Sequence, residues 1–410
     1  MDATPAHQIH VQARGSSRAA PMDSGARLSH ALLSYLVVLI TSLQLLPFEF
    51  AIPDQLPFSI AFTPLSTLAS LAMFVPYGFL SSRARTGRGQ QIGAVALSAA
   101  MLALVLETAQ LFEPSTEASV WHLLAAIAGA AGGAWLCERL HHNARGTANA
   151  VHAMLLQLPL MGLAYLLLPL LWASSAAALG DPVRLILTIS VGLAGASLIG
   201  SIARATRGFT PNREWWLVPS VAAVWSIIGL GPSVTFDWRV TLLGIAAVTA
   251  LASWRGRWSA PVGVERRYEG PALLAAAPFL LVYFVGASVW PLHSFRSIPL
   301  VHLGMPTTEA GLALALPLLE MGIASTVLGY VIAEFQGRAE SGFGETSGQV
   351  FFWVFGILVT NEVARSFFGY EGASLLRAGL SLCAALYGAG LYHLQRAHVK
   401  VLAHRVHTAR

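Results

Sequence analysis

The sequence predicts an all-α protein, a polytopic membrane helix bundle of about twelve transmembrane helices. Hydrophobic residues make up 55% of the 410 residues and charged residues only 11%, whereas a soluble domain carries roughly a quarter of its residues as charges. The mean hydropathy is +0.62. Apolar runs long enough to cross roughly 30 Å of hydrocarbon recur along almost the whole chain. These observations leave no room for a water-soluble fold with a single anchor.

Twelve apolar segments are candidate transmembrane spans, and sequence patterns define their ends to within about 2–4 residues. The seventh, eighth and eleventh are shorter than the roughly 20 residues that a spanning helix needs. The twelve segments are Ser29–Pro47, Pro64–Ser81, Gln91–Phe112, Val120–Cys137, Met154–Ala173, Val183–Ile202, Trp215–Leu230, Val240–Trp254, Ala272–Val289, Ala310–Ala333, Val350–Val363 and Ser374–Leu391.

The distribution of basic residues supports this map, because Lys and Arg gather on the cytoplasmic side of membrane proteins. If the N-terminus lies in the cytoplasm, twenty of the 25 Lys and Arg residues fall in segments on that side. We therefore expect twelve spans with both termini cytoplasmic. The five basic residues on the opposite side are Arg184, Arg239, Arg296, Arg365 and Arg377.

Charge and cysteine content exclude several classes of function. The formal net charge is +5, but the basic residues are spread one loop at a time, so no nucleic-acid-binding patch is expected. Cys137 and Cys383 both lie in apolar segments, and they predict buried free thiols rather than a disulfide or a metal site. The chain has no Walker loop and no Rossmann glycine pattern, so we expect no cofactor.

Three motifs mark the first third of the chain. Leu-Leu-Pro-Phe-Glu-Phe (45–50) ends the first span, and Phe-Val-Pro-Tyr-Gly-Phe-Leu (74–80) lies in the second. Glu107 and Gln110 lie one helical turn apart near the end of the third span, before a glycine-rich fourth span. These motifs resemble the VanZ-like family of bacterial membrane proteins over residues 29–140. The resemblance implies a multi-pass protein of the bacterial inner (cytoplasmic) membrane and says more about fold than about mechanism.

The chain departs from the family pattern after the third span. The family has Asp residues and an Asn at the start of the next helix, where this chain has Ser119, His122 and Ala126. Glu107 is an ionisable group inside an apolar stretch, which costs at least about 2–3 kcal/mol unless it is paired or near water. With Gln110, Ser119 and His122 it forms a candidate ligand-binding cluster. A structural lock that closes the hairpin is the alternative.

A second copy of this unit is predicted near the C-terminus. Shifting the chain by 255 residues places residues 107–136 on residues 362–391 without a gap, and nine of the 30 pairs are identical. The preceding segments align less clearly, although residues 289–293 follow the ninth span much as residues 45–49 follow the first. Eight spans separate equivalent positions, an even number. The copies are therefore expected to be parallel internal repeats related by an axis along the membrane normal.

The expected organisation has five parts. A disordered cytoplasmic tail (1–28) precedes a VanZ-like four-helix domain (29–140) and a four-helix insert (151–256). A degenerate second VanZ-like four-helix domain (271–393) and a basic cytoplasmic tail (394–410) follow. The last two parts contain histidines that we expect at the lipid surface as part of a basic amphipathic end: His393, His398, His404 and His407.

The second copy differs from the first in charge. Its candidate residues are Glu362, Arg365, Ser374 and Arg377, with arginines where the first copy has glutamine and histidine. In one interpretation Arg365 neutralises Glu362 one turn away and Arg377 extends outward. In the other, the two arginines meet the acidic motif of the first copy, or an anionic head group, in a cleft between the copies. We expect Glu362 to contact one of these arginines, and Glu107 to contact a polar residue of its own motif or one of them.

Two further groups of ionisable residues are candidates. Glu320 lies in the middle of the tenth span, where an isolated charge is the most costly in the chain. It is either a substrate or proton site that faces a lumen, or a hydrogen-bonded and protonated structural acid. The loop after the ninth span carries His293, Arg296 and His302. Membrane glycan ligases use such residues, but on much longer loops.

The resemblance and the polar motifs together favour a non-enzymatic cell-envelope protein. We expect it to bind or move an amphipathic lipid that bears a glycan or a phosphate, at the outer leaflet. Its expected partners are membrane lipids, a lipid-linked glycan and other envelope proteins. One alternative is a membrane-embedded glycosyl- or phosphotransferase that uses Glu107 as a base. A second is a non-catalytic scaffold for envelope assembly.

Overall fold

The computed structural model describes residues 24–46, 48–52, 58–85, 92–113, 118–143, 158–178, 181, 184–206, 216–230, 238–258, 269–290, 301–302, 312–336, 343–368 and 373–408. Within them the chain forms twelve helices and four strands of two residues each. The helices are α1 (Ser24–Gln44), α2 (Pro64–Ala84), α3 (Ile92–Gln110), α4 (Val120–Asn143), α6 (Leu158–Ala177), α7 (Leu185–Thr206), α8 (Leu217–Leu230), α9 (Trp238–Trp258), α10 (Glu269–Val289), α11 (Leu312–Gln336), α12 (Phe343–Phe368) and α13 (Leu375–Thr408).

Each of the twelve predicted spans corresponds to one of these helices, so the predicted all-α bundle is confirmed. Ten of the helices are long and apolar enough to cross a membrane. The exceptions are α8 and α9. Helix α8 has 14 residues, or about 21 Å at 1.5 Å per residue. Helix α9 carries arginines at its two ends: Arg239, Arg255 and Arg257.

Helix α13 is longer than predicted. It has 34 residues and continues to Thr408, so most of the segment predicted as a separate tail belongs to this helix. His398 is only 6% exposed, and the prediction that the C-terminal histidines lie at the lipid surface is wrong for this residue. The reason is packing against α1, since a Cβ atom on Gly25 would meet the His398 ring. The side chains of His404 and His407 lie outside the described residues.

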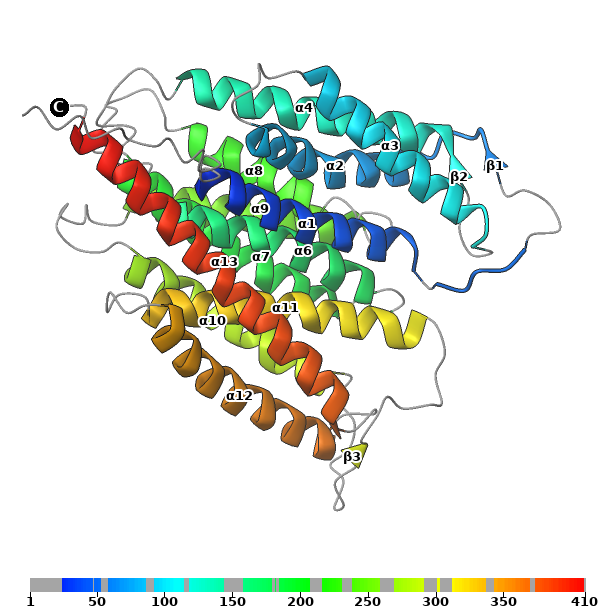
Figure 1. Ribbon diagram of the computed structural model, residues 1–410. Coiled ribbons are helices and arrows are strands. Elements are labelled where there is room, and N and C mark those ends of the chain that lie inside the picture. Colours follow the sequence, from blue (N-terminus) through cyan, green and yellow to red (C-terminus); the bar gives the residue numbers. More distant parts are fainter. Residues whose placement is uncertain are drawn as a thin grey trace, which may run out of the picture.

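Four short strands form two parallel pairs at one end of the bundle. Strand β1 (Phe58–Ser59) pairs with β2 (Ala118–Ser119). Strand β3 (Val301–His302) pairs with β4 (Ala373–Ser374) in the same manner. Both pairs lie opposite the C-terminal end of α13 (Figure 1). We call this end of the bundle the strand end. Because both pairs lie there, the two copies run in the same direction.

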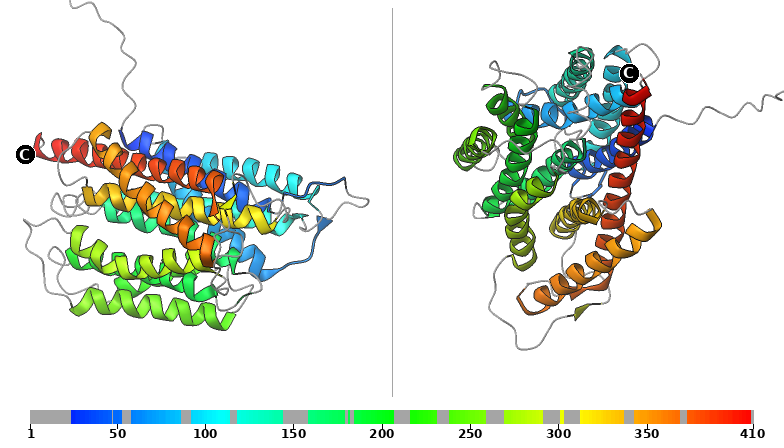
Figure 2. Two further views of the ribbon diagram at one scale, coloured as in Figure 1. Left: turned by 90° about the horizontal axis from the view of Figure 1, so that it is seen from below. Right: turned by 90° about the vertical axis from the view of Figure 1, so that its left-hand side faces the viewer.

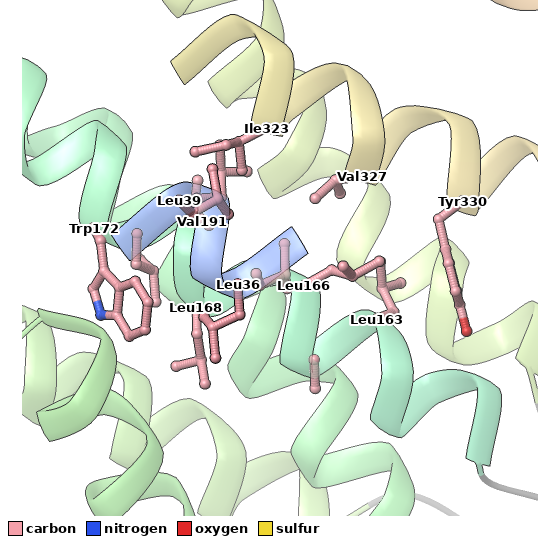
Figure 3. Close-up of a cluster of buried hydrophobic side chains, with 14 of the residues drawn as sticks. Leu36, Leu39, Leu163, Leu166, Leu168, Trp172, Val191, Ile323, Val327 and Tyr330 are labelled. Atoms are coloured by element: carbon pink, nitrogen blue, oxygen red, sulfur yellow. The ribbon is translucent and has the colours of Figure 1, made fainter. Parts of the chain in front are cut away.

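Two helices of the predicted insert, α6 and α7, lie at the centre of the bundle. Helices α6 and α7 are the most buried of the membrane-crossing helices, and α6 packs against α7, α11 and α13. Side chains from α1, α6, α7 and α11 meet in one apolar core, with Trp172 of α6 and Tyr330 of α11 at its two ends (Figure 3). Helix α12, by contrast, lies at the edge of the bundle (Figure 2). Helices α6 and α7 of the insert therefore form the packing core that joins the two copies.

Candidate functional site

A glutamate closes the third hairpin of each copy at the strand end. The backbone N–H of Ser119 donates to Glu107 Oε2 at 2.7 Å. In the second copy the N–H of Ser374 donates to Glu362 Oε2 at 2.9 Å. In both cases the carboxylate belongs to the last turns of one helix, and the serine lies in the strand that leads into the next. The 255-residue shift therefore relates two hydrogen bonds of the same kind.

The two glutamates have different basic partners at equivalent positions. His122 Nδ1 lies 3.5 Å from Glu107 Oε1, and both side chains are partly exposed. Arg377 donates through Nε to Glu362 Oε1 at 3.0 Å and through Nη2 to Oε2 at 2.9 Å. Arg377 is only 3% exposed. A two-point guanidinium–carboxylate pair of this kind is stronger and more directional than the single histidine contact.

These contacts confirm that each glutamate has a basic partner, and they correct two interpretations. Arg377 does not extend outward, because its guanidinium is buried on Glu362. Nor does it meet the acidic motif of the first copy, since the carboxylate that it binds lies in its own copy. Arg365 instead donates from Nη2 to the carbonyl oxygen of Ala287, at 3.3 Å.

The contact of Arg365 has an equivalent in the first copy. Gln110 Nε2 donates to the carbonyl oxygen of Gln44 at 2.9 Å. The acceptors Gln44 and Ala287 lie 243 positions apart, at the ends of α1 and α10, and the first residues of β1 and β3 are displaced by the same amount. The predicted alignment of this region was displaced by 244. The structure corrects it by one residue, so that Leu46 corresponds to Val289.

Close helix crossings also recur in the two copies. A Cβ atom on Gly78 of α2 would overlap the carbonyl oxygen of Ala130 on α4. A Cβ atom on Gly329 of α11 would overlap the carbonyl oxygen of Ala385 on α13. Small residues allow helix backbones to approach this closely inside a membrane. Helices α2 and α11 are thus equivalent, which the sequence comparison did not reveal.

Glu320 belongs to a different polar cluster, about two helical turns into α11 from the strand end. Its Oε2 accepts from Arg184 Nη2 at 2.5 Å, and its Oε1 accepts from the Tyr283 hydroxyl at 2.9 Å. Arg184 lies at the start of α7, Tyr283 on α10 and Glu320 on α11. Glu320 is 4% exposed. Three helices therefore converge on one buried carboxylate, which is hydrogen-bonded as one of the two interpretations expected.

A cavity of about 880 Å³ extends from this cluster between α10, α11 and α12. At the strand end its wall carries Arg184, Glu320 and Arg365, together with the amide of Asn361. Farther from that end the lining is mainly apolar, from Leu281, Leu328, Phe352 and Trp353, with Ser325 as a polar exception. The volume is within the range of roughly 300–1,000 Å³ typical of small-molecule sites. Its polarity changes along the helix axes from charged to apolar.

The apolar part of the cavity opens on the outer surface of the bundle. Phe352 and Trp353 of α12 line the cavity and are 72% and 57% exposed. Leu281 and Val285 of α10, across the opening, also line the cavity and are exposed. In a bundle that crosses a membrane, such a surface faces lipid. From Trp353 to Arg365 the cavity follows twelve helical residues, or about 18 Å, a little more than one leaflet of hydrocarbon.

The surroundings of Arg184 leave one of its donors without a partner. Among the described residues, its Nε is buried and has no hydrogen-bond acceptor. Its neighbour Asp181 accepts from the indole Nε1 of Trp290 at 3.0 Å, and the Trp290 ring lines the cavity. The charged end of the cavity is therefore built from the start of α7, the end of α10, α11 and α12.

The structure divides the predicted site residues into three groups. They are Glu107, Gln110, Ser119 and His122; Glu362, Ser374 and Arg377; and Glu320 with Arg365 at the cavity.

Sequence reasoning missed Arg184, Tyr283 and Trp290. Arg184 was visible only as one of five basic residues assigned to the outer side, and no local pattern links it to a carboxylate 136 positions away. His293 and Arg296 lie outside the described residues, as does the side chain of His302.

Comparison of the chain with protein-family models, curated proteins and solved structures finds no match. The relationship that can inform function is thus internal, between α1–α4 and α10–α13. The features that these units share, hairpin hydrogen bonds and close helix crossings, hold the fold together. The cavity lies against the second unit, and it is the candidate functional site.

Proposed function

We propose that this protein binds an amphipathic lipid in the cavity between α10, α11 and α12. The head group, a phosphate or a phosphate-bearing glycan, would lie at the strand end, against Arg184 and Arg365. Its chain would extend toward Phe352 and Trp353. The observation that carries this proposal is the change of the lining from charged to apolar, in a cavity that opens toward lipid.

The two copies differ where a ligand would enter. In the first copy α1 packs along α2. In the second copy α10 packs mainly against α7 and only weakly against α11. The space between α10 and α11 is where the cavity lies. This supports a ligand site that belongs to the second copy alone.

We further propose a VanZ-like envelope protein of the bacterial inner membrane, with cytoplasmic termini and the strand end facing outward. The motif resemblance over residues 29–140 and the asymmetry of basic residues support this placement. In this orientation the head group lies in the outer leaflet. The expected ligands are then phosphate-bearing or lipid-linked glycan lipids, and the expected protein partners are other envelope components.

The contacts of Glu107 favour a structural role over a transferase base. Its carboxylate closes a hairpin through Ser119, and Glu362 makes the same bond to Ser374 in the second copy. A scaffold without a ligand would agree with the buried Glu362 pair. It would not explain the charged cavity that opens toward lipid. Lipid binding is the proposal that accounts for both the cavity and the Glu362 pair.

The test uses the purified protein and native mass spectrometry with phosphatidylglycerol, a lipid with a phosphodiester head group. Gly356 lines the cavity, and a Cβ atom there would meet no neighbour. Gly356→Phe should therefore fill the cavity without disturbing the helix contacts. We expect at least tenfold weaker lipid binding, which corresponds to about 1.4 kcal/mol.

Gly348→Phe is the matched control. Gly348 lies on the same helix, also has open space at its Cβ, and does not line the cavity. This variant should bind lipid like the wild type. Equal binding by the two variants would refute the proposed site. Turnover of a lipid-linked sugar that is lost in Glu107→Gln would support the transferase instead.

A further inference from the structure

We propose that Glu320 is a resident anion that occupies Arg184 in the absence of a ligand, so that binding of an anionic head group is coupled to uptake of a proton by Glu320. This inference rests on the proposed lipid site and adds a mechanism of regulation to it. The coupling would make lipid binding stronger at lower pH. The coupling depends on the phosphate of the head group and not on the acyl chain of the lipid.

Arg184 is the donor for which the Glu320 carboxylate and a bound phosphate would compete. Arg184 lines the cavity and is the best-placed group for a phosphate there, because a guanidinium binds phosphate oxygens in pairs. Its Nη2 is held by Glu320 Oε2 at 2.5 Å, whereas its Nε has no acceptor among the described residues. A phosphate oxygen that took the place of Glu320 Oε2 on Nη2 would displace the carboxylate.

Among the residues that the structure describes, the charges at this end of the cavity are balanced before a ligand binds. Arg184 and Arg365 are basic, and Glu320 and the nearby Asp181 are acidic. An anionic head group would add one negative charge to a buried site, where an unbalanced charge is strongly unfavourable. Protonation of a carboxylate removes this excess. Of the two acids, Glu320 lines the cavity and is the more buried.

The groups around Glu320 can hold it in either protonation state. Arg184 faces it from the start of α7, Tyr283 from α10 and Arg365 from α12, with the Ser174 hydroxyl of α6 also close by. The Tyr283 hydroxyl donates to Oε1. When Arg184 turns to the phosphate, Oε2 takes a proton from solvent and Oε1 keeps its bond to Tyr283. The only covalent bond formed is the O–H bond of Glu320, and one proton is taken up from solvent for each lipid bound.

The experiment measures the affinity of the full-length protein for phosphatidylglycerol between about pH 5 and pH 8, because the phosphodiester keeps one negative charge over this interval. Wild-type affinity should fall as pH rises, by at most about tenfold per pH unit for one coupled proton. Glu320→Gln cannot ionise and does not compete for Arg184. It should bind with the same affinity at every pH, about tenfold more tightly than the wild type at the upper end.

Glu362→Gln is the matched control. It removes the charge of another buried glutamate that pairs with an arginine at the same end of the bundle, but Glu362 does not line the cavity. This variant should keep the wild-type pH response. A pH response in Glu320→Gln equal to that of the wild type would overturn the coupling while leaving the lipid site intact. An absence of lipid binding by both proteins at every pH would instead refute the lipid site itself.

Two further measurements complete the test. Adding a phosphatidylglycerol with ether-linked chains, which has no ester carbonyl of its own, should produce an infrared carboxylic-acid carbonyl band in the wild type that persists in Asp181→Asn. The absence of this band overturns the coupling even if Glu320→Gln does not fold. Glycerol phosphate, which has the phosphate but no chain, should bind much more weakly than the lipid. Equal binding would assign the site to a soluble phosphate compound and overturn the lipid proposal.

Discussion

The two four-helix units of this protein share their hairpin locks but differ in how the first helix packs. In both, a glutamate accepts the backbone N–H of a serine twelve positions later. In the first unit α1 lies along α2, whereas in the second α10 lies against α7 of the central insert. The shared part holds the strand end together. The altered part leaves a cavity next to α11, which shows how a duplicated scaffold can acquire a site.

The units also differ in the strength of the lock. Glu362 is held by a buried arginine with two hydrogen bonds, whereas Glu107 has a partly exposed histidine at 3.5 Å. The second unit lacks the close packing of α10 on α11. The stronger lock at its strand end holds α12 to α13 beside the cavity.

The largest expected difference concerns these two basic residues. Arg377→Ala should lower the free energy of unfolding by about 3–5 kcal/mol, because it leaves the buried Glu362 charge without its partner. His122→Ala should cost about 1 kcal/mol or less, since that pair is partly exposed. Denaturant unfolding in detergent micelles measures both. Equal losses in the two variants would contradict the difference in strength.

The next expected effect tests what the units share. Gly78→Leu and Gly329→Leu should each destabilise the protein by about 1–3 kcal/mol or more, because each new side chain meets a backbone carbonyl of the facing helix. The controls Gly132→Leu and Gly390→Leu have open space at the Cβ position. Thermal unfolding should show similar losses for the first pair and small ones for the second. A large loss in only one unit would break the equivalence of α2 and α11.

Arg365 and Gln110 form a matched pair of smaller effect on stability. The sequence suggested that Arg365→Ala would leave Glu362 without a partner, but Arg377 fills that role. Each substitution now removes a hydrogen bond to the end of the first helix of its unit, worth about 1 kcal/mol. Only Arg365→Ala should also weaken phosphatidylglycerol binding, by about tenfold. Equal lipid binding by both variants would place Arg365 outside the ligand site.

The last prediction concerns membrane topology. It tests whether the two units cross the membrane in the same direction. In a protein whose native Cys137 and Cys383 are replaced, single cysteines at Glu117 and Gly372 should react with an impermeant reagent from outside. Cysteines at Thr86 and Ser341 should react only after permeabilisation. These four positions lie in predicted loops. Reaction of the first two from opposite faces would contradict parallel repeats.

Hydropathy and one register shift were enough to predict most of the fold. Each predicted span is a helix, because length and apolar content determine what can cross a membrane. The shift of 255 identified the paired hairpins because Glu362 and Ser374 retain both identity and spacing. The equivalence of α2 and α11 was hidden, because the Pro-Tyr-Gly of one unit corresponds to Val-Leu-Gly in the other.

The cavity could not be predicted in this way. It depends on the packing of α10 against α7. This tertiary contact has no corresponding periodic pattern in the sequence of α10. The pairing of Arg184 with Glu320 joins helices that are 136 positions apart. Each of these residues looks, in sequence, like an isolated charge. Only the three-dimensional arrangement shows that they balance each other and line the same space.

The Arg184–Glu320 pair has a consequence for how the chain is made. Arg184 leaves the ribosome 136 residues before its carboxylate, a delay of roughly 7–27 seconds at about 5–20 residues per second. An arginine in the middle of a bilayer costs about 2.5–3.5 kcal/mol or more. During that interval its position at the very start of α7 lets it stay in the head-group region. The pair can therefore form only after α11 has been inserted, so this contact at the strand end waits for the second unit.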